Sequence, residues 1–143
     1  MTAKEYLSQA FRLDQRINSK LEQVSRLRNM AVKATGSFQA ERISGTSQHS
    51  PMESAVVKLI DLEYEINDDI DRLVDLKREM ASLIERIPDP SYRVLLELRY
   101  LGCSRWEDIA LKMGYDLRWV YRLHGRALKE VEIVMRERRN LIE

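Results

Sequence analysis

The stretch from Trp106 to Arg122, WEDIALKMGYDLRWVYR, constrains the fold of this chain more than any other. Ala110 places a small side chain where two short helices would cross, and Gly114 follows where the first of them would end. Glycine has no Cβ and adopts the left-handed conformation of many helix ends without steric cost. The residues that such a pair must bury are apolar: Ile109, Met113, Tyr115, Val120 and Leu123. The spacing therefore predicts a helix–turn–helix.

Capping residues set the expected limits of these two helices. Ser104 and Glu107 have the spacing of a capping box, which predicts that the first helix begins just after Ser104. Asp116 is a favourable N-cap for the second helix, because its carboxylate can accept hydrogen bonds from the first free backbone amides.

Composition favours an all-α protein. Of the 143 residues 33% are charged and 7% aromatic, with five Gly and three Pro, as expected for helices with long solvated faces. The single cysteine, Cys103, excludes an intramolecular disulfide and a cysteine-rich zinc site, and we expect it to be partly buried and inert. No apolar run reaches membrane-spanning length and no signal-peptide core is present. We therefore expect a cytoplasmic protein without a membrane partner.

Residues 3–33 are predicted to form one long amphipathic helix. Apolar residues recur at alternating spacings of three and four, and Lys20 is the one break in this stripe. The stripe consists of Tyr6, Ala10, Leu13, Ile17, Val24, Leu27 and Ala31. Residues 34–50 contain Gly36, Gly45 and several Ser and Thr residues, which indicates a flexible connection. His49 lies in this segment without a second ligand-type neighbour, so we interpret it as a solvated loop residue.

A second long helix is predicted from Pro51 to about Ile87, with Ser50 as its cap. Its apolar positions are Val56, Leu59, Leu62, Ile66, Ile70, Leu73, Leu76, Met80, Leu83 and Ile87. Acidic residues surround this stripe, and without a converging histidine we interpret them as a solvated face rather than a metal or acid–base site. They are Glu63, Glu65, Asp68, Asp69, Asp71 and Asp75.

The two long helices should pair as an antiparallel, coiled-coil-like hairpin. The same apolar stripe would also serve for pairing with a second copy, and the sequence does not separate the two arrangements. Pro88-Asp89-Pro90 then ends the second helix and marks the expected domain boundary. After it we expect a short supporting helix from Tyr92 to Tyr100, closed by Gly102, with Val94, Leu95, Leu98 and Leu101 on its apolar face.

The second helix of the helix–turn–helix has one apolar and one basic face. With about 100° per residue, Leu123, His124, Ala127 and Val131 fall near Val120 and should be buried. The opposite arc consists of Arg118, Arg122, Gly125, Arg126 and Lys129, with Trp119 and Tyr121 at its sides. Guanidinium groups bind phosphates and guanine edges, so this face predicts contact with the major groove of double-stranded DNA. Arg99, Arg105 and Lys112 are candidates for additional phosphate contacts.

Residues 92–132 resemble region 4 of sigma-70-type factors. The matching features are an LxxRY-type end of the first helix, a WxxIA helix, a glycine turn, and a recognition helix that runs into RLHGRAL. Together with ERISGTSQHSPMESAVVKLIDLEYEIN, the pattern resembles small phage and prophage proteins that are catalogued as a domain of unknown function and related to late-gene transcription regulators.

This resemblance implies that residues 88–143 form a sigma-region-4-like DNA-binding domain and that residues 1–87 form an oligomerisation or partner-binding hairpin. It implies base and phosphate contacts by Arg118, Trp119, Tyr121, Arg122 and Arg126, and docking on bacterial RNA polymerase in the cytoplasm of the host cell. Because the promoter-melting segments of a complete sigma factor are missing, we expect recruitment of polymerase rather than replacement of a sigma factor.

Three functions are compatible with these features. The first is a sequence-specific transcription regulator, homo-oligomeric through its N-terminal helices, that activates phage or prophage late genes with host RNA polymerase. The second is the DNA-recognition subunit of a packaging machine, similar to a small terminase. The third is an adaptor that binds polymerase or another protein instead of DNA. The sequence has no phosphate-binding glycine loop and no Ser/His or Cys/His constellation, so it predicts no enzyme, no cofactor and no metal site.

Overall fold

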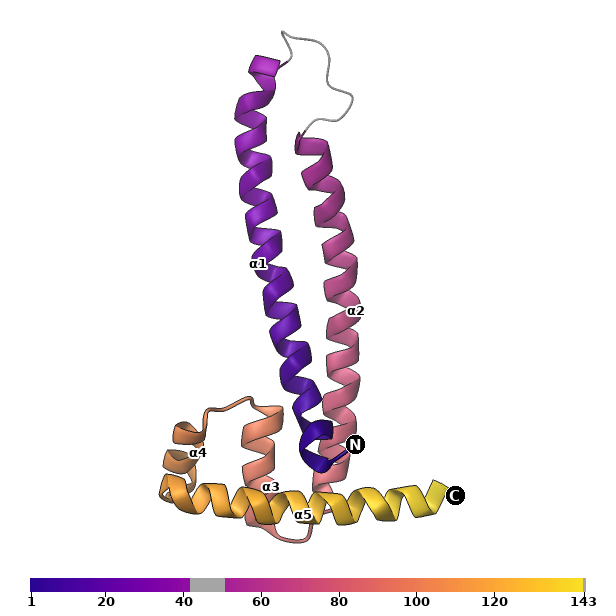
Figure 1. The fold of residues 1–143 in the computed structure, drawn as a ribbon, viewed down its shortest axis with the longest axis vertical. Coiled ribbons are helices and arrows are strands. Elements are labelled where there is room, and N and C mark those ends of the chain that lie inside the picture. The colour runs from indigo at the N-terminus through magenta and orange to yellow at the C-terminus, as the bar shows by residue number, and fades with distance from the viewer. Residues whose placement is uncertain (42–50, 143) are drawn as a thin grey trace. The chain divides into compact units, whose positions relative to one another are not determined.

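The computed structural model describes the backbone of residues 1–41 and 51–142 and the side chains of residues 1–33 and 51–142. The fold is all-α, as predicted, and contains no strand within these residues. Its elements in chain order are α1 (Ala3–Glu41), α2 (Pro51–Glu85), α3 (Pro90–Leu96), the π-helical turn η1 (Glu97–Leu101), α4 (Trp106–Met113) and α5 (Leu117–Ile142), as Figure 1 shows. No helix of the described part is long and apolar enough to cross a membrane.

The chain divides into two compact units. One, here called the core unit, combines Met1–Leu13 with Leu73–Glu143, and the other, the paired-helix unit, consists of Asp14–Arg72. The division therefore does not coincide with the boundary predicted at residues 87 and 88, because the last turns of α2 and the first turns of α1 pack with the C-terminal helices.

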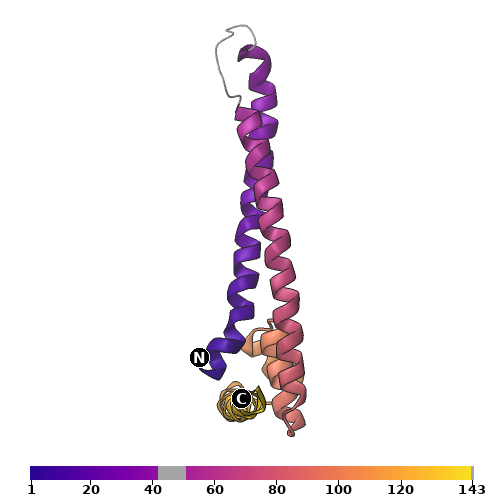
Figure 2. The same ribbon diagram turned by 90° about the vertical axis from the view of Figure 1, so that its right-hand side faces the viewer.

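In the paired-helix unit, α1 and α2 run antiparallel along each other (Figures 1 and 2). Their buried apolar residues include Ile17, Val24, Ala55 and Ile66. The prediction for α1 is partly wrong at its end, because the helix continues through Gly36 to Glu41 instead of ending at residue 33. The rest of the predicted connection, residues 42–50 with His49, lies outside the described residues.

Lys20, which interrupts the apolar stripe predicted for α1, forms a buried ion pair. The Lys20 ammonium donates a hydrogen bond of 2.6 Å to Asp69 Oδ2, and the two residues are only 8% and 4% exposed. Lys20 Nζ also lies 3.5 Å from Glu65 Oε2, and Arg16 Nε lies 3.8 Å from Asp69 Oδ2. The assignment of Asp69 to a solvated acidic face is therefore wrong. The hydrogen bond from Lys20 lowers the pKa of the Asp69 carboxyl below its ordinary value, against the opposing effect of burial.

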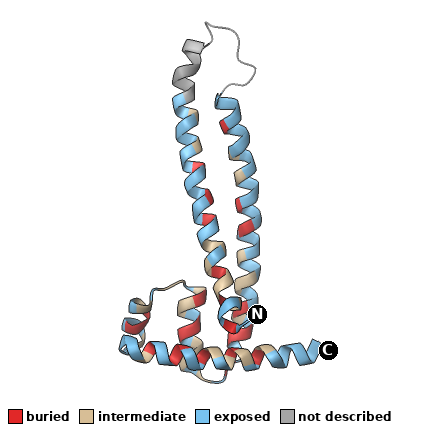
Figure 3. Ribbon diagram, viewed as in Figure 1, coloured by how far each residue is buried: buried red, intermediate tan, exposed pale blue. Residues whose placement is uncertain are grey.

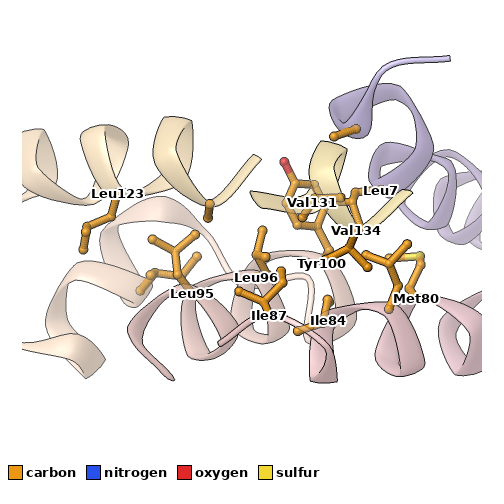
Figure 4. Close-up of a cluster of buried hydrophobic side chains, with 14 of the residues drawn as sticks. Leu7, Met80, Ile84, Ile87, Leu95, Leu96, Tyr100, Leu123, Val131 and Val134 are labelled. Atoms are coloured by element: carbon orange, nitrogen blue, oxygen red, sulfur yellow. The ribbon is translucent and has the colours of Figure 1, made fainter. Parts of the chain in front are cut away.

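One hydrophobic cluster holds the core unit together. Figure 4 shows side chains from the start of α1, the end of α2, α3 and α5 that converge in it. Its fully buried large residues are Leu7, Met80, Ile84, Ile87, Leu95, Leu96, Ile109, Val120 and Val131. Side chains of this size contribute roughly 1.5–3 kcal/mol each when they are removed from water. The cluster therefore fixes α5 against the other helices of the core unit.

The prolines after α2 position the next helix through a cap. Asp89 accepts hydrogen bonds from the amides of Ser91 (2.8 Å) and Tyr92 (3.4 Å), so α3 begins at Pro90 as an Asp-capped helix. The predicted apolar face of this helix is partly wrong, since Leu96 is buried and Val94 is exposed.

A π-helical turn follows α3 directly. The amide of Gly102 donates to the carbonyl of Glu97, five residues earlier, over 2.9 Å. The wider turn changes the helical phase after Leu96 and places Tyr100 in the core, where it is 3% exposed. The residue that takes a left-handed backbone after this turn is Cys103 (φ 52°), whereas Gly102 has a right-handed conformation.

The turn between α4 and α5 follows the prediction closely. Gly114 has a left-handed backbone (φ 73°) and its amide donates to the last carbonyls of α4, and Asp116 Oδ1 accepts from the amide of Trp119 over 2.8 Å. Both predicted caps at this turn are confirmed. The capping box at Ser104 is wrong, because the N-cap of α4 is Arg105 and no side chain caps it. Tyr115 is also exposed rather than buried.

Candidate nucleic-acid interface

The first half of α5 presents one buried and one exposed face. Val120, Leu123, His124, Ala127 and Val131 are buried, as the helical wheel predicts. The residues of the opposite arc are all exposed: Arg118, Arg122, Gly125, Arg126 and Lys129. Buried and exposed positions alternate along α5 in Figure 3 accordingly. We call the exposed set the α5 basic face.

The cationic groups of the α5 basic face are not neutralised by any carboxylate that the structure describes. None of Arg118, Arg122, Arg126 and Lys129 forms an ion pair with a carboxylate among residues 1–33 and 51–142. The Arg126 guanidinium lies 5.3 Å from the centre of the Trp119 ring, which orients it without removing its charge. Exposed cations without a carboxylate partner remain available for phosphate oxygens or base edges.

The two aromatic residues beside this face differ in exposure. Tyr121 is 48% exposed, and its ring lies 5.3 Å from that of Trp106 on α4 in an edge-on arrangement. Trp119 is half-buried and packs against the hydrophobic cluster of the core unit. Tyr121 therefore has a free edge for a ligand, and Trp119 mainly supports Arg126.

The three basic residues outside α5 have different environments. Lys112 is exposed on α4, and Arg105 is exposed but paired with Asp108 over 3.3 Å. The Arg99 guanidinium lies 4.7 Å from the Phe11 ring centre and 4.4 Å from that of Trp106, and it donates to the Ser104 carbonyl over 2.9 Å. Arg99 is thus engaged within the core unit, which argues against the phosphate contact predicted for it.

A buried polar contact supports α5 from behind. Burial raises the pKa of Tyr100, so its hydroxyl stays protonated, and the hydroxyl oxygen forms a hydrogen bond of 2.6 Å with His124 Nε2. The Trp106 ring lies 4.6 Å from the His124 ring. Burial, followed by the nearby cations Lys4 and Arg99, lowers the pKa of His124 to about 4, so the imidazole is neutral at pH 7. His124 is the packing residue that the sequence indicates.

The lowered pKa of His124 predicts that folding depends on pH. The unfolded chain binds a proton at His124 below about pH 6.5 and the folded chain only below about pH 4, so stability should fall as the pH decreases through this window. We expect the melting temperature to drop by a few degrees between pH 7 and pH 5. A His124→Gln variant should lose most of this drop, and an equal drop in both proteins would contradict the assignment.

Most of the chain, including the α5 basic face, falls within a family match. Residues 32–132 match the model of a family described as proteins of unknown function (DUF1492). The chain belongs to this family. No curated protein and no solved structure matches the chain. The matched region extends from the last turns of α1 into α5 and includes every residue of the basic face, but the family description carries no activity.

No group of three or more His, Cys, Asp or Glu side chains among the described residues is arranged to hold a metal ion. Sequence reasoning missed the contact between Tyr100 and His124 because the residues are 24 positions apart and the π-helical turn changes the helical phase between them. It also missed the role of Arg99, whose neighbours Phe11 and Trp106 come from distant helices.

Proposed function

We propose that the chain is a sequence-specific DNA-binding transcription regulator that inserts the first half of α5 into the major groove. The observation that carries this proposal is the α5 basic face. It has four exposed cations without carboxylate partners among the described side chains, opposite a face that is packed into the core unit. A helix held rigidly from behind can present its guanidinium groups to base edges with little loss of entropy.

Different residues of the site would have different roles. Arg118 and Arg122 lie nearest the N-terminus of α5, the part of a recognition helix that reaches base edges, and their guanidinium forks fit guanine O6 and N7. Arg126, Lys129, Arg105 just before α4 and Lys112 on α4 would contact phosphates and set the register on the duplex. Tyr121 would contact sugars and thymine methyl groups, and Trp119 would orient Arg126. The resemblance to sigma region 4 supports a role in phage or prophage late transcription with host RNA polymerase.

We further propose that the regulator is a homodimer through the paired-helix unit. Arg28 Nη2 lies 3.9 Å from Glu63 Oε1 on one flank of the pair. Leu21 lies seven residues before Arg28, and Val56 and Ile70 lie seven residues on either side of Glu63, so these exposed apolar residues share that flank. Ile60 and the 69% exposed Tyr64 extend it along α2. The ion pair neutralises itself, so a second copy could pack there without burying net charge, in a four-helix arrangement.

Sedimentation tests the dimer. The native chain should sediment as a dimer at micromolar concentration, and an Ile60→Glu/Tyr64→Glu variant should sediment as a monomer because two carboxylates would be buried at the interface. The control variant Lys58→Glu changes an exposed residue of α2 that lies about 120° or more around the helix from Ile60 and Tyr64, and it should remain dimeric. A ring of many subunits would favour the packaging function, and a native monomer would contradict the proposed dimer.

An adaptor that binds protein is the second candidate. A groove of about 470 Å³ in the core unit is lined by Pro90, Ser91, Val94, Leu98, Lys112, Met113 and Tyr115. Its exposed Val94 and Tyr115 would suit an apolar segment of a protein partner. The groove shares no residue with the α5 basic face, but Lys112 lines the groove and is also a proposed phosphate contact, so the two partners would meet at Lys112.

Selection from a pool of randomised duplexes tests the DNA-binding function. We expect the native chain to enrich a discrete sequence motif over several rounds at about 150 mM salt, where non-specific phosphate contacts are weak. Enrichment of a motif would leave the choice between promoter and packaging site to the position of that motif in a genome. Salt-sensitive binding without a motif would favour the adaptor.

A further inference from the structure

Gly125 occupies the middle of the α5 basic face. With about 100° per residue, Arg118, Arg122 and Lys129 all project within about 60° of its direction. Arg122 lies nearly one turn before it and Lys129 about one turn after it. The cationic residues of the α5 basic face therefore surround Gly125, the one position of this face that has no side chain.

Nothing within the described chain requires a glycine at this position. Its backbone φ is not positive, because Gly114 is the glycine with a positive φ among the described residues. A Cβ built on Gly125 would meet no atom within 4 Å, so no neighbouring helix needs the space. Gly102 differs in this respect, since a Cβ there would lie 3.1 Å from the carbonyl oxygen of Leu98.

Glycine weakens a helix at such a position. It loses more backbone freedom on folding than any other residue, and an exposed interior position of a helix is more stable with alanine. Gly125 lies well inside α5, which runs from Leu117 to Ile142. A helix-weakening residue on an exposed, sterically open site is explained if a surface outside the chain approaches the helix backbone there.

We propose that Gly125 is the point of closest approach between α5 and the floor of the major groove. This inference rests on the proposed function and adds its docking geometry. The missing side chain lets the helix backbone approach the base edges at Gly125. Arg118 and Arg122 then reach guanine edges, and Lys129, about one turn after Gly125, reaches a phosphate.

The depth to which α5 enters the major groove determines what the neighbouring arginines contact. Arg122 lies one turn before the deepest point, so its guanidinium reaches base edges when the helix is fully inserted. A larger residue at 125 would hold the helix away from the bases while the long side chains still reach phosphates. Gly125 thus acts as a specificity-determining position, although it offers no hydrogen-bonding side chain.

Substitutions of Gly125 separate stability from recognition. The variants Gly125→Ala and Gly125→Leu should both fold, and both should melt a few degrees higher than the native chain. On the duplex obtained by selection, Gly125→Ala should bind about threefold more weakly and Gly125→Leu at least about 30-fold more weakly by fluorescence anisotropy. On a scrambled duplex at low salt, all three proteins should bind within about threefold of one another, because phosphate contacts persist. Ser82→Leu, at an exposed position of α2, is the control and should bind as the native chain does.

Two results would overturn the inference. If Gly125→Leu is folded and binds the selected duplex within twofold of the native chain, Gly125 is not a point of close approach, although the DNA-binding function would stand. If the native chain binds no duplex, the inference fails together with the proposed function. The inference is supported if Gly125→Leu melts at a higher temperature than the native chain and loses affinity for the selected duplex but not for the scrambled one.

Discussion

Replacing Arg118 and Arg122 together by alanine is expected to weaken binding to the selected duplex by at least about 100-fold. A bidentate contact between arginine and a guanine edge contributes roughly 1–3 kcal/mol of discrimination, and both guanidinium groups are exposed without an ion pair in the described chain. If either group contacts phosphate instead, the dependence of log K on log salt should become shallower by about 0.9 for each lost contact. Anisotropy titrations at several salt concentrations measure both quantities.

The matched control removes the same charge elsewhere. Arg12 and Arg26 are exposed arginines of α1, so the double variant Arg12→Ala/Arg26→Ala has the same net charge as the α5 variant. We expect it to bind the duplex within about threefold of the native chain. Equal losses in the two double variants would mean that DNA responds to total charge rather than to the α5 basic face, and would count against the proposal.

The largest effect on stability is expected from Lys20→Met. This change leaves the Asp69 carboxylate nearly buried, with Arg16 at 3.8 Å and the nearby Arg72 as remaining cations. Removing one partner of a buried ion pair costs about 3–5 kcal/mol, and the exposed Arg16 should reduce this to about 3 kcal/mol. Urea denaturation at pH 7 measures the loss. Because Lys20 lowers the pKa of Asp69, the native pair should also lose stability as the pH falls below about 4.

A second substitution distinguishes the ion pair from simple packing. Lys20→Met/Asp69→Leu replaces both charges with apolar side chains and should recover stability to within about 1 kcal/mol of the native chain. The double variant should also show weaker specificity of pairing between α1 and α2, since a buried polar pair fixes the register of two helices. A double variant no more stable than Lys20→Met would show that the site needs the polar pair for packing, which contradicts this account.

The sequence predicted the parts of the molecule that depend on local rules. Gly114 ends α4 and Asp116 caps α5 because each requirement is met within a few residues. The two faces of α5 follow from helical periodicity alone, and they define the candidate site.

The failures involve partners that are distant in the chain. Asp69 resembled its acidic neighbours, and only the break in the α1 stripe at Lys20 pointed to a buried pair. The capping box failed because Ser104 is used differently: its amide donates to the Leu98 carbonyl at the end of the π-helical turn, and α4 begins later. No local sequence pattern predicts such a turn, so the burial of Tyr100 within it could not be predicted.

Hydrogen exchange of backbone amides, with and without the selected duplex, tests the central claim most directly. If the α5 basic face enters the major groove, amides of residues 117–129 should exchange more slowly in the complex. Exchange rates in the paired-helix unit should stay the same as long as the oligomeric state does not change. Arg118→Ala/Arg122→Ala should abolish this protection. Protection confined to the groove beside α3 and α4, or to the paired-helix unit, with residues 117–129 unaffected, would contradict the proposal that α5 is the DNA-binding element.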